Sequence, residues 1–212
     1  MPRIVDHDER RAVIADALVR VAGREGLHEV TMRSVAAEAG VSLRLVQYYF
    51  RSKARLMRAA LERMERQSHE RWEARLAELS SPVSARAFLE AFLDEALPTD
   101  EQSRTFHLVW TSYATLAMTE KNLAEQPFVG GPDRLERQLT DTLKKAQADG
   151  RLVPGLDAFQ EAATLLNLSH GLGTSVLVGQ RTAESARAVL RYHLNRLFGV
   201  PATSEARTHP ED

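Results

Sequence analysis

The stretch Thr31–Lys53 decides the fold, and it reads TMRSVAAEAGVSLRLVQYYFRSK. Thr31 has a hydroxyl suited to capping a helix, and the small apolar residues Val35, Ala36 and Ala39 give that helix a buried face. Gly40 can adopt the positive φ that a sharp reversal requires, and Ser42 can cap a second short helix. The stretch therefore predicts two short helices joined by a tight turn.

The second of these helices is expected to present mostly polar side chains outward. On the 3.6-residue period, Val46 and Phe50 share its inward face. A helix of this size fits the major groove of DNA, where Arg pairs with guanine edges and Gln with adenine edges. The pattern therefore predicts a helix-turn-helix that binds duplex DNA. The side chains expected to face outward are Leu43, Arg44, Gln47 and Tyr48.

The stretch resembles the N-terminal helix-turn-helix of the TetR-type (tetracycline-repressor-like) family of bacterial transcription regulators. The likeness rests on Gly26, Thr31, the AGVS turn at 39–42, the aromatic cluster at 48–50, and Lys53 after a three-residue step. A small helix, a glycine and another small helix also occur in all-helical proteins that bind no nucleic acid. The aromatic residues and the lysine at these offsets favour the TetR-type interpretation.

One position departs from the family pattern, which most often has Tyr where this chain has Gln47. The phosphate or base contact that this Tyr makes in the family is therefore expected either from Gln47 or from Tyr48. Tyr48 and Tyr49 could also be core aromatics, but neighbours on a helix point about 100° apart, so at least one is expected to be exposed. The resemblance implies base contacts from Arg33, Leu43, Arg44 and Gln47, and phosphate contacts from Thr31, Ser42, Tyr48, Tyr49 and Lys53.

The distribution of charge favours DNA binding by the N-terminal part. The whole chain of 212 residues has a net charge of -1. Residues 1–55 contain ten Lys or Arg and seven Asp or Glu, a net of +3, whereas residues 56–212 contain eighteen and twenty-two, a net of -4. Because the basic excess is modest, we expect affinity to depend on two copies binding together and to fall with salt.

The remaining sequence predicts an all-α fold without convincing strand alternation. A first helix is expected from Asp6 to Gly26 and a fourth from Ser52 to about Leu79, followed by helical segments at 84–97, 101–120, 133–149, 157–179 and 182–198. We predict a three-helix DNA-binding domain at 1–52, a helical effector-binding and dimerisation domain at 53–200, and a disordered polar tail at 201–212.

The composition limits the other possibilities. The chain is 43% hydrophobic and has no cysteine, which excludes disulfides and cysteine metal sites and fits a reducing cytoplasm. No signal segment is predicted, and polar residues and glycines interrupt the most apolar helix, so we expect a soluble, cytoplasmic protein that does not enter the membrane. The seven histidines are scattered without ligand spacing, so no metal or cofactor is expected.

No catalytic pattern is present. The chain lacks HExxH, GxSxG and GxxxxGK, and the carboxylates of Asp94 and Glu95 would diverge on a helix because the residues are neighbours. We therefore expect no enzymatic activity. The alternative to a DNA-binding regulator is a helical scaffold that binds only proteins, which predicts no salt-sensitive DNA binding.

The last two long helices predict a homodimer. Small residues such as Gly171 and Gly173 leave a surface that another helix can approach closely. In TetR-type proteins the C-terminal helices of two subunits form a four-helix interface, and the likeness implies the same here. The alternative is that these helices only complete the core of the monomer. The candidate interface residues are Leu168, Gly171, Leu172, Ser175, Val176, Val189, Leu190, His193, Leu194 and Leu197.

The resemblance also implies a cavity for an unidentified small-molecule effector in the middle of the chain. Such cavities are mostly apolar with a few orienting polar groups. Aromatic residues at helical spacing are more often plain core, so the family likeness, and not the spacing, supplies this prediction. The candidate lining residues are Phe88, Phe92, Phe106, His107, Trp110, Thr111, Tyr113, Leu166, Asn167 and His170.

The mechanism implied by the resemblance is a two-state switch. Most relatives are repressors that bind a near-palindromic operator as dimers, and an effector shifts the long connecting helix between the head and the body. A coupling of about 1 to 3 kcal/mol would change operator affinity by roughly five- to 150-fold, and operator DNA would weaken effector binding equally.

Overall fold

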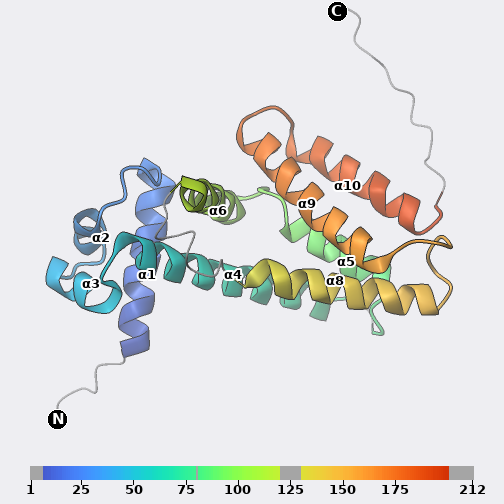
Figure 1. The fold of residues 1–212 in the computed structure, drawn as a ribbon, viewed down its shortest axis with the longest axis horizontal. Coiled ribbons are helices and arrows are strands. Elements are labelled where there is room, and N and C mark those ends of the chain that lie inside the picture. The colour runs from blue at the N-terminus through green and yellow to red at the C-terminus, as the bar shows by residue number, and fades with distance from the viewer. Residues whose placement is uncertain (1–6, 80, 120–129, 201–212) are drawn as a thin grey trace, which may run out of the picture.

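The structure, a computed structural model, describes residues 7–79, 81–119 and 130–200, and its regular elements in those ranges are all helices (Figure 1). The predicted all-α fold class is confirmed. The expected tail at 201–212 lies outside the described residues. The helices are α1 (His7–Glu25), α2 (Met32–Glu38), α3 (Leu43–Phe50), α4 (Lys53–Ala77), α5 (Ala85–Glu95), α6 (Glu101–Thr119), α8 (Gly131–Ala148), α9 (Ala158–Leu177) and α10 (Ala183–Leu197).

The predicted start signals of α2 and α3 are confirmed. The Thr31 hydroxyl accepts a hydrogen bond from the Ser34 amide at 2.9 Å, and the Ser34 hydroxyl accepts one from the Thr31 amide at 2.9 Å. At α3 the Ser42 hydroxyl accepts from the Leu45 amide at 3.2 Å. Gly40 between the two helices has φ +64°, which makes the sharp reversal possible.

Several helix boundaries differ by one or two residues from those expected, among them the ends of α5 at Glu95 and of α9 at Leu177. α8 begins at Gly131 and not at residue 133. Pro132 is accepted in its first turn because backbone N–H groups there have no partner within the helix, so the missing N–H of proline costs no hydrogen bond. α4 ends at Ala77, so Leu79 lies beyond the helix and is exposed. No helix among the described ranges has the length and apolar character that a membrane crossing requires.

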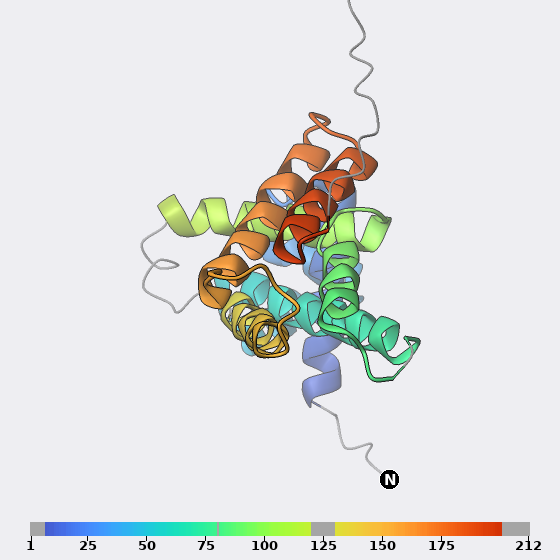
Figure 2. The ribbon, with the colours of Figure 1, turned by 90° about the vertical axis from the view of Figure 1, so that its right-hand side faces the viewer.

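The long helix α4 belongs to two hydrophobic cores. Its first half, from Leu56 to Met64, packs in one cluster with α1, α2, α3 and part of α6, whereas Trp72 in its second half packs with α5, α8, α9 and α10. Figure 1 shows α4 running from the first group of helices into the second, and Figure 2 shows α9 and α10 side by side in the second group. α4 therefore connects a head, formed by α1–α3, to a body, formed by α5–α10.

An ion pair joins α4 to the first helix of the head. The Arg63 guanidinium donates two hydrogen bonds to the Asp16 carboxylate, from Nε to Oδ1 at 2.5 Å and from Nη2 to Oδ2 at 2.9 Å. Both side chains are partly exposed, so we expect the pair to stabilise the fold by no more than about 1 kcal/mol. Its bidentate geometry fixes the orientation of α1 against α4.

Candidate functional site

The surface of α3 is polar and accessible. Val46 and Phe50 are buried as predicted, while Arg44, Gln47 and Tyr48 are exposed, Tyr48 by 69%. Leu43, expected to face outward, is only partly exposed because it packs against the core of the head. The remaining side chains of α3 are those that a major groove would meet. Arg33 on α2, and Thr31 and Ser42 at the starts of α2 and α3, are exposed as well.

The two tyrosines of α3 have different surroundings. Tyr49 is half-buried, its hydroxyl forms a hydrogen bond with Nδ1 of His7 at 2.9 Å, and its carbonyl accepts one from Arg11 at 3.0 Å. Tyr49 is therefore held against α1, which leaves Tyr48 as the more accessible of the two for a phosphate. Lys53, also expected at a phosphate, is partly buried, and its ammonium donates to the carbonyl of Leu27 at 3.4 Å.

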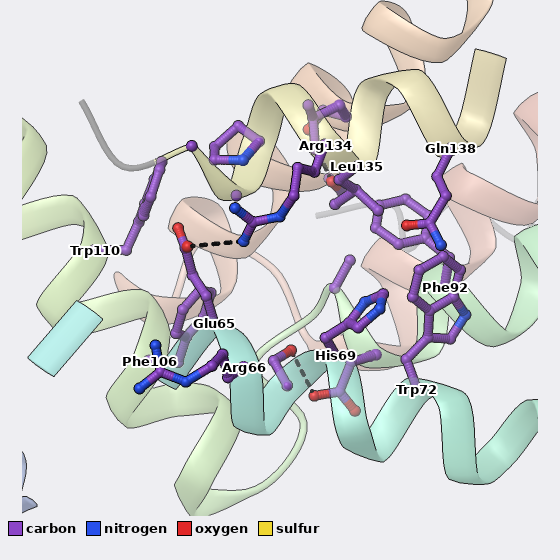
Figure 3. Close-up of a pocket in the computed structure, with 18 of the residues that line it drawn as sticks. Glu65, Arg66, His69, Trp72, Phe92, Phe106, Trp110, Arg134, Leu135 and Gln138 are labelled. Atoms are coloured by element: carbon purple, nitrogen blue, oxygen red, sulfur yellow. Dashed lines mark hydrogen bonds and ion pairs between the residues drawn. The ribbon is translucent and has the colours of Figure 1, made fainter. Parts of the chain in front are cut away.

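The body contains an open cavity of about 960 Å³ between α4, α5, α6, α8 and α9 (Figure 3). Its size lies within the range usual for small-molecule sites. Aromatic rings from three helices form much of the wall: Trp72 of α4, Phe92 of α5, and Phe106 and Trp110 of α6. Of the ten residues that the sequence predicts for the lining, six lie there: Phe92, Phe106, His107, Trp110, Leu166 and His170.

Phe88 and Tyr113, two predicted lining residues, lie outside the cavity wall. Phe88 packs edge-on against Trp72, with ring centroids 4.8 Å apart, in the core of the body. Tyr113 is buried in the other cluster together with Val109, which lies one turn earlier on α6. Residues four apart share a helical face. Val109 and Tyr113 therefore share the face of α6 that points to the head, whereas Phe106 and Trp110 share the face that lines the cavity.

Asn167 and Thr111 are also corrections to the predicted lining. Asn167 is exposed, and its amide donates to the carbonyl of Ala163 at 2.8 Å on its own helix. It lies about 100° around α9 from Leu166, which does line the cavity. Thr111 is similarly displaced from Trp110 on α6 and is absent from the wall.

The cavity contains a buried carboxylate, that of Glu65 on α4 (Figure 3). The side chain of Glu65 is 10% exposed, Oε2 lies 3.8 Å from the Arg134 guanidinium, and Oε1 has no hydrogen-bond partner among the described residues. Burial raises the pKa of Glu65 to about 7, while Arg134 acts in the opposite direction. A Cβ on residue 131 would lie 2.4 Å from this carboxylate, so Gly131 allows α8 to begin beside it.

The other titratable groups deep in the cavity add little charge at neutral pH. Nε2 of His107 lies 3.0 Å from the carbonyl of Ala96, and burial lowers the pKa of His107 to about 4. Burial also lowers the pKa of His170, whose ring lies beside that of Trp110 with centroids 5.7 Å apart. Both imidazoles are therefore largely neutral near pH 7.

A second carboxylate at the cavity, that of Glu95, is neutralised by its neighbours. It accepts hydrogen bonds from Arg71 and from the Ser68 hydroxyl, the latter at 2.9 Å, and Arg75 lies 3.3 Å away. Glu65 has no comparable set of partners among the residues described. Those residues also contain no group of three or more His, Asp or Glu placed to bind a metal ion.

The face expected to form the dimer is only partly available. Leu172, Leu190, Leu194 and Leu197 are buried in the core of the body, because the apolar stripes of α9 and α10 face one another and α5. Gly173 is also buried, where a Cβ would lie 2.7 Å from the His107 ring. The other predicted interface residues are at least partly exposed: Leu168, Gly171, Ser175, Val176, Val189 and His193.

Two family models match the chain. The model described as "Bacterial regulatory proteins, tetR family" matches residues 14–60, and the model described as "BetI-type transcriptional repressor, C-terminal" matches residues 82–199. The curated HTH-type transcriptional regulator BetI of Agrobacterium fabrum is 31% identical over 172 residues, which are 81% of this chain and 79% of the relative. The HTH-type transcriptional regulator PksA of Bacillus subtilis is 23% identical over 213 residues and matches 99% and 100% of the two chains.

Solved structures are similar over most of the chain. A protein from Rhodococcus sp., described as a TetR-family transcriptional regulator, superposes with a TM-score of 0.78 at 26% identity and covers 90% of this chain and 99% of its own. A protein from Saccharomonospora viridis, described as a transcriptional regulator in complex with choline, superposes with a TM-score of 0.75 at 27% identity and covers 89% and 97%.

Proposed function

Because the chain belongs to the TetR family of bacterial transcription regulators, we propose that it is a repressor that binds a near-palindromic operator as a homodimer. We further propose that a small organic cation enters the cavity and releases the protein from DNA. The buried Glu65 carboxylate among aromatic rings is the observation that carries the assignment of the effector. Members of this family regulate transcription and are not enzymes.

The cavity has the chemistry that binds a quaternary ammonium. Faces of Trp and Phe attract cations, and the attraction grows when the cation leaves water. Glu65 supplies a negative charge with an unused oxygen, and the two imidazoles carry little positive charge near neutral pH. The choline bound to the Saccharomonospora viridis protein supports the same class of ligand here. We therefore assign choline or a cation of similar size and charge as the effector.

The position of Glu65 on α4 connects the cavity to the head. Glu65 lies two residues after Arg63, and Arg63 is bound to Asp16 of α1. A cation that draws Glu65 inward moves the same helix that α1 and α3 pack against, which changes the separation of the two α3 helices in a dimer. We keep residues 1–52 as the DNA-binding domain and 53–200 as the effector-binding and dimerisation domain, with α4 as the coupling element.

Arg44→Ala is expected to lower affinity for the operator by about 1 to 3 kcal/mol, roughly five- to 150-fold, because Arg44 is exposed in the first turn of α3 and suited to a guanine edge. Binding to random duplex should fall much less. The measurement is a competition mobility-shift assay with DNA from upstream of the chain's own gene. Arg151→Ala removes the same charge from an exposed site at the end of α8 and should change neither affinity. Equal losses on both duplexes for Arg44→Ala would contradict a base-reading role.

Choline affinity should rise by about tenfold between about pH 6 and pH 8, because Glu65 with a pKa near 7 is mostly protonated at the lower pH and mostly ionised at the higher. The pKa values of the buried imidazoles are lowered, which takes their titration toward lower pH. Calorimetric titration of choline across this range checks the prediction, and Glu65→Gln should give a flat profile. The other charged or titratable groups that line the cavity are Glu62, Arg66, His69, Glu70, Glu73, Glu95, His107, Arg134, Arg137, Asp141 and His170.

A further inference from the structure

Arg134 lies where it can compete with a ligand for the Glu65 carboxylate. It is in the first turn of α8, its side chain is 64% exposed, and it extends from the solvent side of the cavity toward Glu65 (Figure 3). The distance of 3.8 Å between Nη2 and Oε2 is too long for a hydrogen bond. Among the described residues Arg134 has no other ion pair.

The guanidinium and a cationic ligand need the same electrostatic partner. The cavity wall that contains Glu65 holds aromatic rings as well as charged groups, and a second positive charge beside Arg134 would be repelled at short range. A ligand that neutralises Glu65 therefore binds best when Arg134 has moved away. The pair has no hydrogen bond and its guanidinium is exposed, so it contributes little free energy and its displacement requires only a small part of the ligand's binding energy.

We infer that Arg134 is an internal competitor of the effector: it neutralises Glu65 in the free protein and is displaced when an organic cation binds. This inference rests on the proposed cationic effector and adds the residue that sets the concentration at which the regulator responds. Displacement also removes the ion pair between α4 and α8, so occupancy of the cavity changes the restraints on the connecting helix.

The test compares choline binding by the full chain and by Arg134→Gln, measured by calorimetry at about pH 9. The higher pH keeps Glu65 ionised in both proteins, because the loss of Arg134 removes a charge that lowers the pKa of Glu65. Without the competitor, affinity should rise by about two- to fivefold, the range expected for loss of one weak ion pair with an exposed guanidinium. Arg151→Gln is the matched control, because Arg151 is exposed, carries the same charge and is not part of the cavity wall. Its affinity should match that of the unchanged chain.

Chemical rescue gives a second measurement. In Arg134→Ala, millimolar guanidinium chloride should occupy the vacated position and weaken choline binding toward the value of the unchanged chain, whereas sodium chloride at equal ionic strength should not. Circular dichroism would show that the exposed substitutions leave the helices intact.

The possible results distinguish the competitor role of Arg134 from the proposal that the effector is a cation. If the unchanged chain binds choline and Arg134→Gln binds it equally or more weakly, the competitor role is wrong and the cationic effector stands. If neither the unchanged chain nor Arg134→Gln binds choline or tetramethylammonium, both ideas are wrong. Equal tightening in Arg151→Gln would show a general effect of the protein's positive charge and would also overturn the specific role of Arg134.

Discussion

Glu65→Gln is expected to lower the affinity for choline by at least about thirtyfold, the largest effect of a single substitution in the cavity. The change keeps the shape of the side chain and removes its charge, and loss of one partner of a desolvated charge pair costs about 2 to 5 kcal/mol. Calorimetry at about pH 8, with Glu65 ionised in the unchanged chain, measures the effect.

The control for this substitution is Glu62→Gln. Glu62 lies on the same wall of the cavity, nearly one turn earlier on α4, and is paired with Arg58 through a hydrogen bond of 2.9 Å. Its loss should change choline affinity by less than about threefold, because the exposed pair is screened by water. Binding by Glu65→Gln that stays within the same range would contradict the assignment of Glu65 as the cation partner.

The stability of Glu65→Gln separates a local loss of binding from misfolding. The pKa of Glu65 is raised in the folded state, so the unfolded chain loses its proton first and stability falls as the pH rises from about 4.5 to about 7. Gln carries no such charge. The variant should therefore unfold at a higher temperature than the unchanged chain at about pH 8, and the difference should shrink toward about pH 5.

Gly171→Trp is expected to convert the proposed dimer to monomers and to lower operator affinity by about a hundredfold or more, because a single head loses the gain from binding two half-sites together. Gly171 is exposed on α9, and a Cβ added there meets no atom of the protomer within 4 Å, so the protomer has room for the larger side chain. A partner helix packed closely on this face would collide with the indole. Light scattering gives the mass, and a mobility-shift assay gives the affinity.

Lys144→Trp is the matched control for the dimer face. Lys144 is exposed on α8 and is not among the predicted interface residues, so the same added ring should leave the mass and the operator affinity unchanged. A Gly171→Trp protein that remains a dimer at nanomolar concentration would place the interface elsewhere on the body.

The head could be predicted closely from sequence because its signals are local. Thr31 and Ser42 cap the helices that begin directly after them, and Gly40 supplies the turn between these helices. The residues that determine this local structure therefore all lie within a short stretch of sequence. The assignment of Val46 and Phe50 to the buried side follows from a single period along eight residues. Tyr49 is different, because only the distant His7 and Arg11 decide that it is held against α1.

The cavity and the dimer face depend on how helices are rotated against one another, which no local pattern fixes. From sequence alone, the apolar stripe of α10 could pack either on a partner subunit or on α5 and α9 of the same chain. The structure shows that Leu190 and Leu194 face inward, into the core of the body. Glu65 could not be singled out among the many glutamates of α4. Its burial depends on α8, and on the absence of a side chain at Gly131, 66 residues later in the chain.

The sharing of α4 between two cores limits how such regulators can be recombined. A graft that exchanges only residues up to the end of α3 would place a foreign head on Leu56, Met57 and Leu61, whose shapes match the original α1. Close packing makes such mismatches destabilising. A chimaera with new DNA specificity is better joined after Met64, where α4 leaves the first core, and the borrowed segment then brings its own Asp16–Arg63 pair while Glu65 and the cavity stay with the recipient.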